Sequence, residues 1–188
     1  APKMFAVKKR PDVTEAELED AFSEQALGLA MGGADGIVIE TMGDLAEAQC
    51  AVRAASETGL PVVCCMVFDH GQDKDRTMMG HTPEDAVAAL ADSGIMALGA
   101  NCGAGIDAYI DVCRRYRAAT NLPLWIKPNA GLPEWLDGKV HYASTPGEFS
   151  MKVKHVLDAG ATFVGGCCGT NPAFIHRVAE DHGSVHSA

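Results

Sequence analysis

The organisation of this chain is decided close to its end, by residues 162–170, which read TFVGGCCGT. The first three residues are an apolar run that predicts a short buried strand. Asn171-Pro172 follows, and proline at a first helical position predicts a helix start. The adjacent cysteines Cys167 and Cys168 therefore lie where a strand ends and a helix begins. The glycines around them permit backbone angles that other residues rarely adopt.

The same order of strand, loop and helix recurs upstream. Apolar runs alternate with segments whose apolar residues recur at helical spacing, and several of these segments begin at a threonine that can cap a helix. The predicted strands cover 36–40, 61–68, 95–99, 122–127 and 162–164, and the predicted helices cover 14–30, 43–59, 82–94, 108–120, 145–160 and 172–181. We expect loops at 69–81 and 128–144. This alternation predicts an α/β fold of five βα units with a parallel sheet, either an open doubly wound sheet or part of a (β/α)8 barrel.

Composition narrows the class of protein. The chain has 188 residues, is 47% hydrophobic and has a net charge of -10. That length is enough for one domain, 1–188, with a core of its own. The acidic balance argues against nucleic acid or an anionic membrane as the main partner. No apolar run reaches the roughly 18 residues of a membrane helix.

Cysteine use indicates a reducing compartment. The seven cysteines are an odd number, and no hydrophobic signal region opens the chain. We therefore expect a soluble, cytoplasmic protein whose cysteines pack, bind metal or react. Residues 183–188 are expected to form a disordered tail.

Three cysteines follow strand ends. Cys102 ends the apolar run 95–99 much as Cys167 and Cys168 end theirs, and each position is flanked by glycine. Three thiolates with a vacant fourth place are typical of a catalytic zinc site. Packing as small buried hydrophobic residues, or a redox pair, are the alternatives. The other cysteines are expected to pack in the core: Cys50, Cys64, Cys65 and Cys113.

Polar side chains also follow strand ends. Glu40 ends an apolar strand, where a carboxylate is costly to bury without a partner. It could hold a substrate ammonium group, act as a general base, or cap a loop. Asn101 and Asn129 could orient a substrate or satisfy loop backbone. The glycine-rich segment 99–105 does not match the dinucleotide-binding pattern.

Five segments in this order resemble one family: ETM at 40–42, TMMG at 77–80, GANC at 99–102, KPNAG at 127–131 and GGCCGT at 165–170. The chain resembles the homocysteine S-methyltransferase family, a zinc-dependent barrel, and KPNAG is closer to its bacterial methionine-synthase branch. The resemblance implies that Cys102, Cys167 and Cys168 bind Zn²⁺ and that the homocysteine thiol takes the fourth position. It also implies that Glu40 holds the amino-acid part of homocysteine. Asn101 and Asn129 would support the site.

The chain departs from the family at its start. Family barrels have further βα units before the equivalent of Glu40, and a full barrel needs about 250 residues. We therefore expect a partial barrel without the first βα units, which lie on the same gene product or on another chain. Residues 1–10 would be the remnant of a strand. A non-catalytic zinc-binding half-barrel that needs a partner chain is one alternative.

The methyl donor is not evident from the chain. It has no D-x-H-x-x-G segment of the kind that ligates cobalt in cobalamin modules. If the donor is methylcobalamin, we expect another domain or a separate corrinoid protein to carry it. A corrinoid-system methyltransferase that acts on another thiol or a methylated substrate is the second alternative.

Overall fold

The structure, a computed structural model, describes residues 13–183. Its helices are α1 (Glu15–Met31), α2 (Leu45–Ser56), α3 (Pro83–Leu90), α4 (Ile106–Ala119), α5 (Pro146–Asp158) and α6 (Pro172–His182). Its strands are β1 (Ile37–Met42), β2 (Val62–Met66), β3 (Ala97–Cys102), β4 (Leu124–Pro128), β5 (Pro133–Leu136), β6 (Lys139–Tyr142) and β7 (Phe163–Val164). Of the tail expected at 183–188, residues 184–188 lie outside the described residues, as does the strand remnant expected at 1–10.

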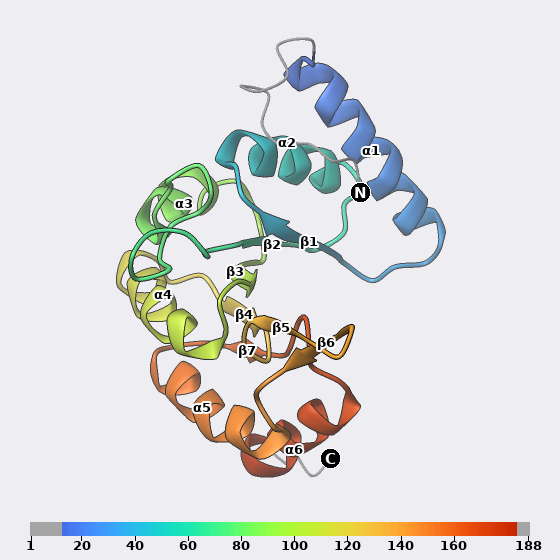
Figure 1. The fold of residues 1–188 in the computed structure, drawn as a ribbon. Helices are drawn as coiled ribbons and strands as arrows, with labels where there is room; N and C mark the ends of the chain where they lie inside the picture. The colour runs from blue at the N-terminus through green and yellow to red at the C-terminus, as the bar shows by residue number, and fades with distance from the viewer. Residues whose placement is uncertain (1–12, 184–188) are drawn as a thin grey trace.

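Five strands form one parallel sheet in the order β1-β2-β3-β4-β7. The strands follow an arc with the helices along its outer side, which confirms the predicted α/β repeat (Figure 1). Within the described residues the sheet does not close, because β1 and β7 are its two edges. The arrangement is that of a partial barrel.

Helix starts follow the capping chemistry that the sequence predicts. Thr14, Thr82 and Thr145 each accept a hydrogen bond from the backbone three residues later, and the acidic side chain at that position bonds back to the threonine N–H. Such reciprocal capping satisfies two amide groups that a helix end otherwise leaves unpaired. Asp44 and Asn171 cap α2 and α6 in a simpler way, with the side chain alone.

The outer face of the sheet carries the core. Alternate strand residues point towards the helices and are almost fully buried: Ile37, Cys64, Met66, Leu98, Ala100, Leu124 and Ile126. Large side chains from helices and loops pack against them, among them Phe149 of α5, whose ring meets Phe174 of α6 edge-on at 5.5 Å. Burying a side chain of this size contributes about 1.5–3 kcal/mol, so the outer face dominates the stability of the fold.

The inner face is lined by the other set of alternate residues: Val38, Glu40, Val63, Cys65, Ala97, Gly99, Asn101, Trp125, Lys127 and Phe163. Its centre holds only a small cluster, in which Trp125 packs on Val63, Cys65 and Ala97. Towards the two edges, Val38 is 42% and Phe163 43% exposed. Apolar runs at 36–40 and 162–164 predict buried strands, but β1 and β7 are exposed on their inner side, since no second layer of the described chain covers it.

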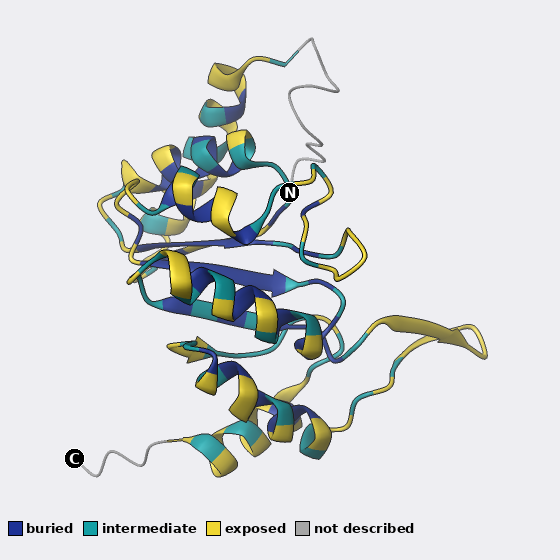
Figure 2. Ribbon diagram, turned by 90° about the vertical axis from the view of Figure 1, so that its left-hand side faces the viewer, coloured by how far each residue is buried: buried dark blue, intermediate teal, exposed yellow. Residues whose placement is uncertain are grey.

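A hairpin replaces part of the loop expected at 128–144. β5 and β6 pair antiparallel around Asp137 and Gly138, both of which have positive φ angles of 51° and 74°. Two consecutive positive φ values define the turn that matches the twist of a tight hairpin. The hairpin projects from the carboxyl end of the sheet and is exposed over most of its length (Figure 2). The expectation of a loop throughout 128–144 is wrong for residues 133–142.

The base of the hairpin is anchored beside the cysteine pair. A Cβ atom on Gly169 would lie 2.3 Å from the ring of Tyr142, so only glycine permits this approach. Gly169 also has a φ of 81°, which favours glycine. Over residues 13–183, no helix has the length and apolar character to cross a membrane.

Candidate metal centre

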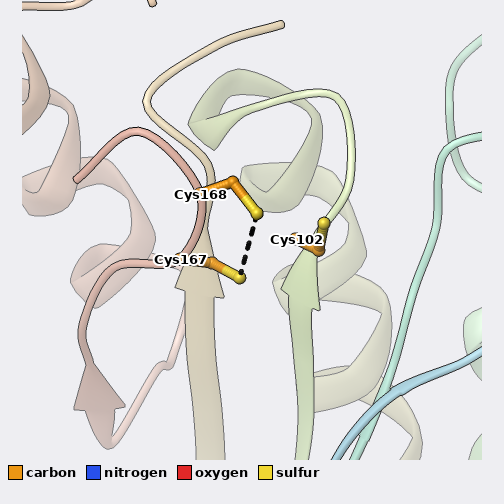
Figure 3. A group of neighbouring side chains, drawn as sticks. All are labelled: Cys102, Cys167 and Cys168. Carbon is orange, nitrogen blue, oxygen red and sulfur yellow. Dashed lines mark hydrogen bonds between the residues drawn. The ribbon is translucent and has the colours of Figure 1, made fainter. Parts of the chain in front are cut away.

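Three thiols converge at the carboxyl end of the sheet. Cys102 ends β3, and Cys167 and Cys168 follow β7. Their sulfur atoms all lie within 4.8 Å of one another, and those of Cys167 and Cys168 are 4.0 Å apart (Figure 3). These distances confirm the predicted convergence of the three side chains. They converge because the carboxyl ends of parallel strands meet at one edge of a sheet.

Unusual backbone geometry aims the Cys102 thiol. Cys102 has a φ of 67° and Gly103 one of 69°. Left-handed backbone in a non-glycine residue is uncommon and stores about 1–3 kcal/mol of strain. A Cβ on Gly103 would lie 2.5 Å from the Tyr109 hydroxyl oxygen and 2.8 Å from the Phe68 carbonyl oxygen. The close packing around Gly103 therefore fixes the turn that presents Cys102.

Asn129 ties the two cysteine segments together. Its Nδ2 donates to the Gly103 carbonyl at 2.8 Å and lies 3.5 Å from Cys102 Sγ. Its Oδ1 accepts from the Cys168 backbone N–H at 2.9 Å. The side chain is only 5% exposed, so these bonds are shielded from water. Of the two roles expected for Asn129, the geometry shows the one that satisfies loop backbone, and it also reaches a sulfur.

Asn101 does the same on the side of β1. Its Oδ1 accepts from the Thr41 backbone N–H at 2.7 Å, and its Nδ2 donates to Thr41 Oγ1 at 2.8 Å. The same Nδ2 lies 3.7 Å from Cys167 Sγ. Thr41 has a φ of 64°, a genuine outlier for a β-branched residue. Asn101 thus holds a strained turn and one of the three thiols at once.

Glu40 lies on the inner face in an ion pair. Its Oε1 is 2.5 Å from Lys127 Nζ, and about a third of its side chain is exposed. The partner that a carboxylate at this strand end needs is therefore a lysine of β4, which the sequence reasoning did not identify. No local sequence signal could have found it, because the two residues are 87 positions apart.

The pKa of Cys168 reflects its place in the cluster. Partial burial, and after it the charges of the neighbouring Cys102 and Cys167 thiols, together raise the pKa of Cys168 to about 11. Three negative charges so close together need a cation between them. A metal ion bound between the three sulfurs would supply that positive charge.

The residues fit a zinc ion. Tetrahedral zinc with Zn–S bonds of about 2.3 Å places its thiolate sulfurs about 3.8 Å apart, close to the separations in this cluster. The sulfurs are partly exposed, and two asparagine amides lie near them as donors. Such outer hydrogen bonds usually orient metal ligands.

The remaining cysteines lie in the core, as predicted. Cys50 is 1% exposed, and Cys64, Cys65 and Cys113 are completely buried. Burial raises the pKa of Cys64 to about 12 and that of Cys113 to about 11. These thiols stay protonated at neutral pH and serve as packing.

Comparison with known proteins gives the class. The family model described as "Homocysteine S-methyltransferase" matches residues 2–182. The chain belongs to the homocysteine S-methyltransferase family.

Two methionine synthases are among its relatives. The one from Mycobacterium tuberculosis is 33% identical over 171 residues, which cover 87% of this chain and 14% of that protein. The one from Mycobacterium leprae is 32% identical over 169 residues, or 86% of this chain and 14% of the relative. The chain thus spans about a seventh of these relatives.

Solved structures agree on the fold. The homocysteine methyltransferase MmuM from Escherichia coli, in its apo form, superposes with a TM-score of 0.73 at 22% identity. The match covers 89% of this chain and 57% of MmuM. The carboxyl transferase domain of Rhizobium etli pyruvate carboxylase shares the fold more distantly, with a TM-score of 0.53 at 16% identity over 83% of this chain and 24% of that chain.

Proposed function

We propose that this chain is the thiol-activating part of a methyltransferase that moves a methyl group to homocysteine and forms methionine. The observation that carries the proposal is the convergence of Cys102, Cys167 and Cys168 at the carboxyl end of the sheet. Membership of the homocysteine S-methyltransferase family supports the choice of substrate.

Cys102, Cys167 and Cys168 would hold zinc. When bound, zinc lowers the pKa of a thiol at its fourth position, so that the thiol is a thiolate nucleophile near neutral pH. Asn101 and Asn129 would keep the cysteine sulfurs in place through their amide N–H groups, and Glu40 would hold the ammonium group of the substrate. The hydrogen bonds of both asparagines support these roles, since they leave each amide little freedom to turn.

A partner would supply the rest of the reaction. The methyl donor we propose is methylcobalamin on another domain or on a corrinoid protein, and the much greater length of the methionine synthase relatives supports this. Further βα units would cover the inner face of the sheet. The exposure of Val38 and Phe163 at the edges of that face supports this proposal. A reducing, cytoplasmic location would keep the three thiols free to bind metal.

The test combines metal content with substrate binding and turnover. We expect about one zinc per chain, binding of homocysteine to the zinc-loaded chain, and methionine formation when methylcobalamin and any missing βα units are added. Cys113→Ser is the matched control for Cys102→Ser, because it removes a thiol from the core and leaves the three cluster cysteines intact.

Two outcomes would contradict the proposal. Zinc binding without any affinity for homocysteine would favour a methyltransferase for another thiol, or a non-catalytic zinc-binding half-barrel. A chain that takes up no zinc and forms a reversible Cys167–Cys168 disulfide would favour a redox protein.

A further inference from the structure

The ion pair between Glu40 and Lys127 joins strands that are not neighbours. Glu40 lies on β1 and Lys127 on β4, with β2 and β3 between them in the sheet. Both side chains lie on the inner face, where Gly99 of β3 packs between Cys65 and Trp125. A Cβ there would lie 2.5 Å from Cys65 Sγ and 2.3 Å from the Trp125 carbonyl oxygen. Two opposite charges therefore meet on the inner face across two intervening strands.

Packing directs the Lys127 side chain along this face. Gly165 lies against its stem, where a Cβ would be 3.2 Å from Lys127 Cγ and 3.8 Å from its Cε. In the sheet Lys127 pairs with Asn101, whose Nδ2 is 3.7 Å from Cys167 Sγ. Lys127 thus lies beside Asn101 in the sheet, the residue that precedes the cluster thiol Cys102.

The pair is accessible and exchangeable. The side chain of Lys127 is 27% exposed and that of Glu40 is 36% exposed. A half-exposed ion pair contributes little to folding, since water and salt screen it. A ligand with both charges can therefore replace the contact at little cost to the fold.

We propose that Lys127 binds the α-carboxylate of an amino-acid thiol and so determines which thiols this site accepts. The inference rests on the proposed function. An α-amino acid carries an ammonium and a carboxylate group on one carbon, in the order that Glu40 and Lys127 complement. A thiol without a carboxylate leaves Lys127 in contact with Glu40. The lysine then competes with the ammonium group of that thiol for the carboxylate oxygens of Glu40. Lys127 thereby selects amino-acid thiols over simple aminothiols.

The experiment compares two thiols on the zinc-loaded chain by calorimetry. Homocysteine is matched with 3-aminopropane-1-thiol, which has the same thiol and amine but no carboxylate. We expect the wild-type chain to bind homocysteine at least about tenfold more tightly, as a charge-assisted hydrogen bond provides. Lys127→Met should lower the affinity for homocysteine about tenfold or more and should not weaken binding of the aminothiol. Lys127→Arg should keep the preference.

The outcomes separate this inference from the proposed function. An equal loss of affinity for both thiols in Lys127→Met would show a structural role and overturn the inference. Equal affinity of the wild-type chain for both thiols would overturn it as well, with thiol binding at zinc intact. If neither thiol binds the zinc-loaded wild-type chain, the proposed function itself fails. Thermal unfolding and zinc content of each variant establish that the fold and the cluster are unchanged.

Discussion

The two faces of the sheet are built from alternate residues of the same strands and differ in almost every property. The outer face is a continuous apolar layer beneath the helices. The inner face has a small apolar cluster, an exposed ion pair and the approach to three thiols. Stability and chemistry are thus separated by strand alternation, so that a change on one face should leave the other largely intact.

Truncation of an aromatic ring gives the largest expected contrast between the faces. Phe149→Ala removes a fully buried ring beneath α5 and should lower the free energy of unfolding by about 3–5 kcal/mol. Phe163→Ala removes a partly exposed ring that contacts Trp125 at a tilt, with a centroid distance of 5.1 Å, and should cost about 1 kcal/mol. Urea unfolding measures both. Equal losses would mean that the inner face is covered in solution, for example by a second chain.

Removal of a thiol should affect zinc affinity at the metal centre and stability in the outer core. Cys102→Ser should weaken zinc binding by more than about 100-fold, since even the loss of an outer hydrogen bond to a metal ligand costs about 10–100-fold. Cys113→Ser should leave zinc affinity unchanged and lower stability instead, because the thiol is completely buried in the outer core. Competition with a chromophoric chelator gives the affinities. The comparison fails if the two variants lose zinc equally.

Loss of an asparagine tests how the metal centre is held. Asn129→Ala removes the bonds to the Gly103 carbonyl and the Cys168 N–H, and should reduce zinc affinity about 10–100-fold. Asn121→Ala, at an exposed position before β4, is the matched control and should change nothing. The same chelator competition applies. Unchanged affinity in Asn129→Ala would show that backbone geometry alone positions the thiols.

The smallest expected effect concerns pH and lies in the helical layer. Burial, and secondarily the neighbouring Asp44, raise the pKa of Glu47 in α2 from 4.5 to about 7. The folded state therefore binds this proton more tightly than the unfolded state, and stability falls as the pH rises from about 4.5 to about 7. Glu47→Gln should be more stable than wild type at pH 8, by at most about 1 kcal/mol given solvent screening, and equal to it at pH 4. Thermal unfolding across this range is the measurement, and a gain at pH 4 of the same size would contradict it.

Much of the fold could be predicted because its signals are local. The capping threonines Thr14, Thr82 and Thr145 fix where three helices begin, and each is adjacent in sequence to the residues it bonds. The apolar runs fix the strands for the same reason. The exposure of Val38 could not be read from its sequence, since a valine in an apolar run looks the same whether or not another layer covers it.

The hairpin was missed although a local signal existed. Asp137-Gly138 between short apolar segments is a strong hairpin signal, but Pro133, the charges and the short length of 133–142 conceal the strands. The three thiols could be predicted to meet from their places at strand ends. The ion pair between Glu40 and Lys127 could not, because the two residues are 87 positions apart and lie on strands that are not neighbours in the sheet.

The hairpin also gives the molecule a spectroscopic property. The chain has two tryptophans, and the fold places them in contrasting surroundings. Trp125 packs within the inner cluster, whereas Trp135 at the hairpin is 74% exposed. Emission from the first should lie at shorter wavelength than emission from the second, and iodide should quench mainly the second. A partner that binds the hairpin would therefore change the emission of Trp135, and a ligand that binds the inner face would change that of Trp125. Intrinsic fluorescence distinguishes the two events without a label.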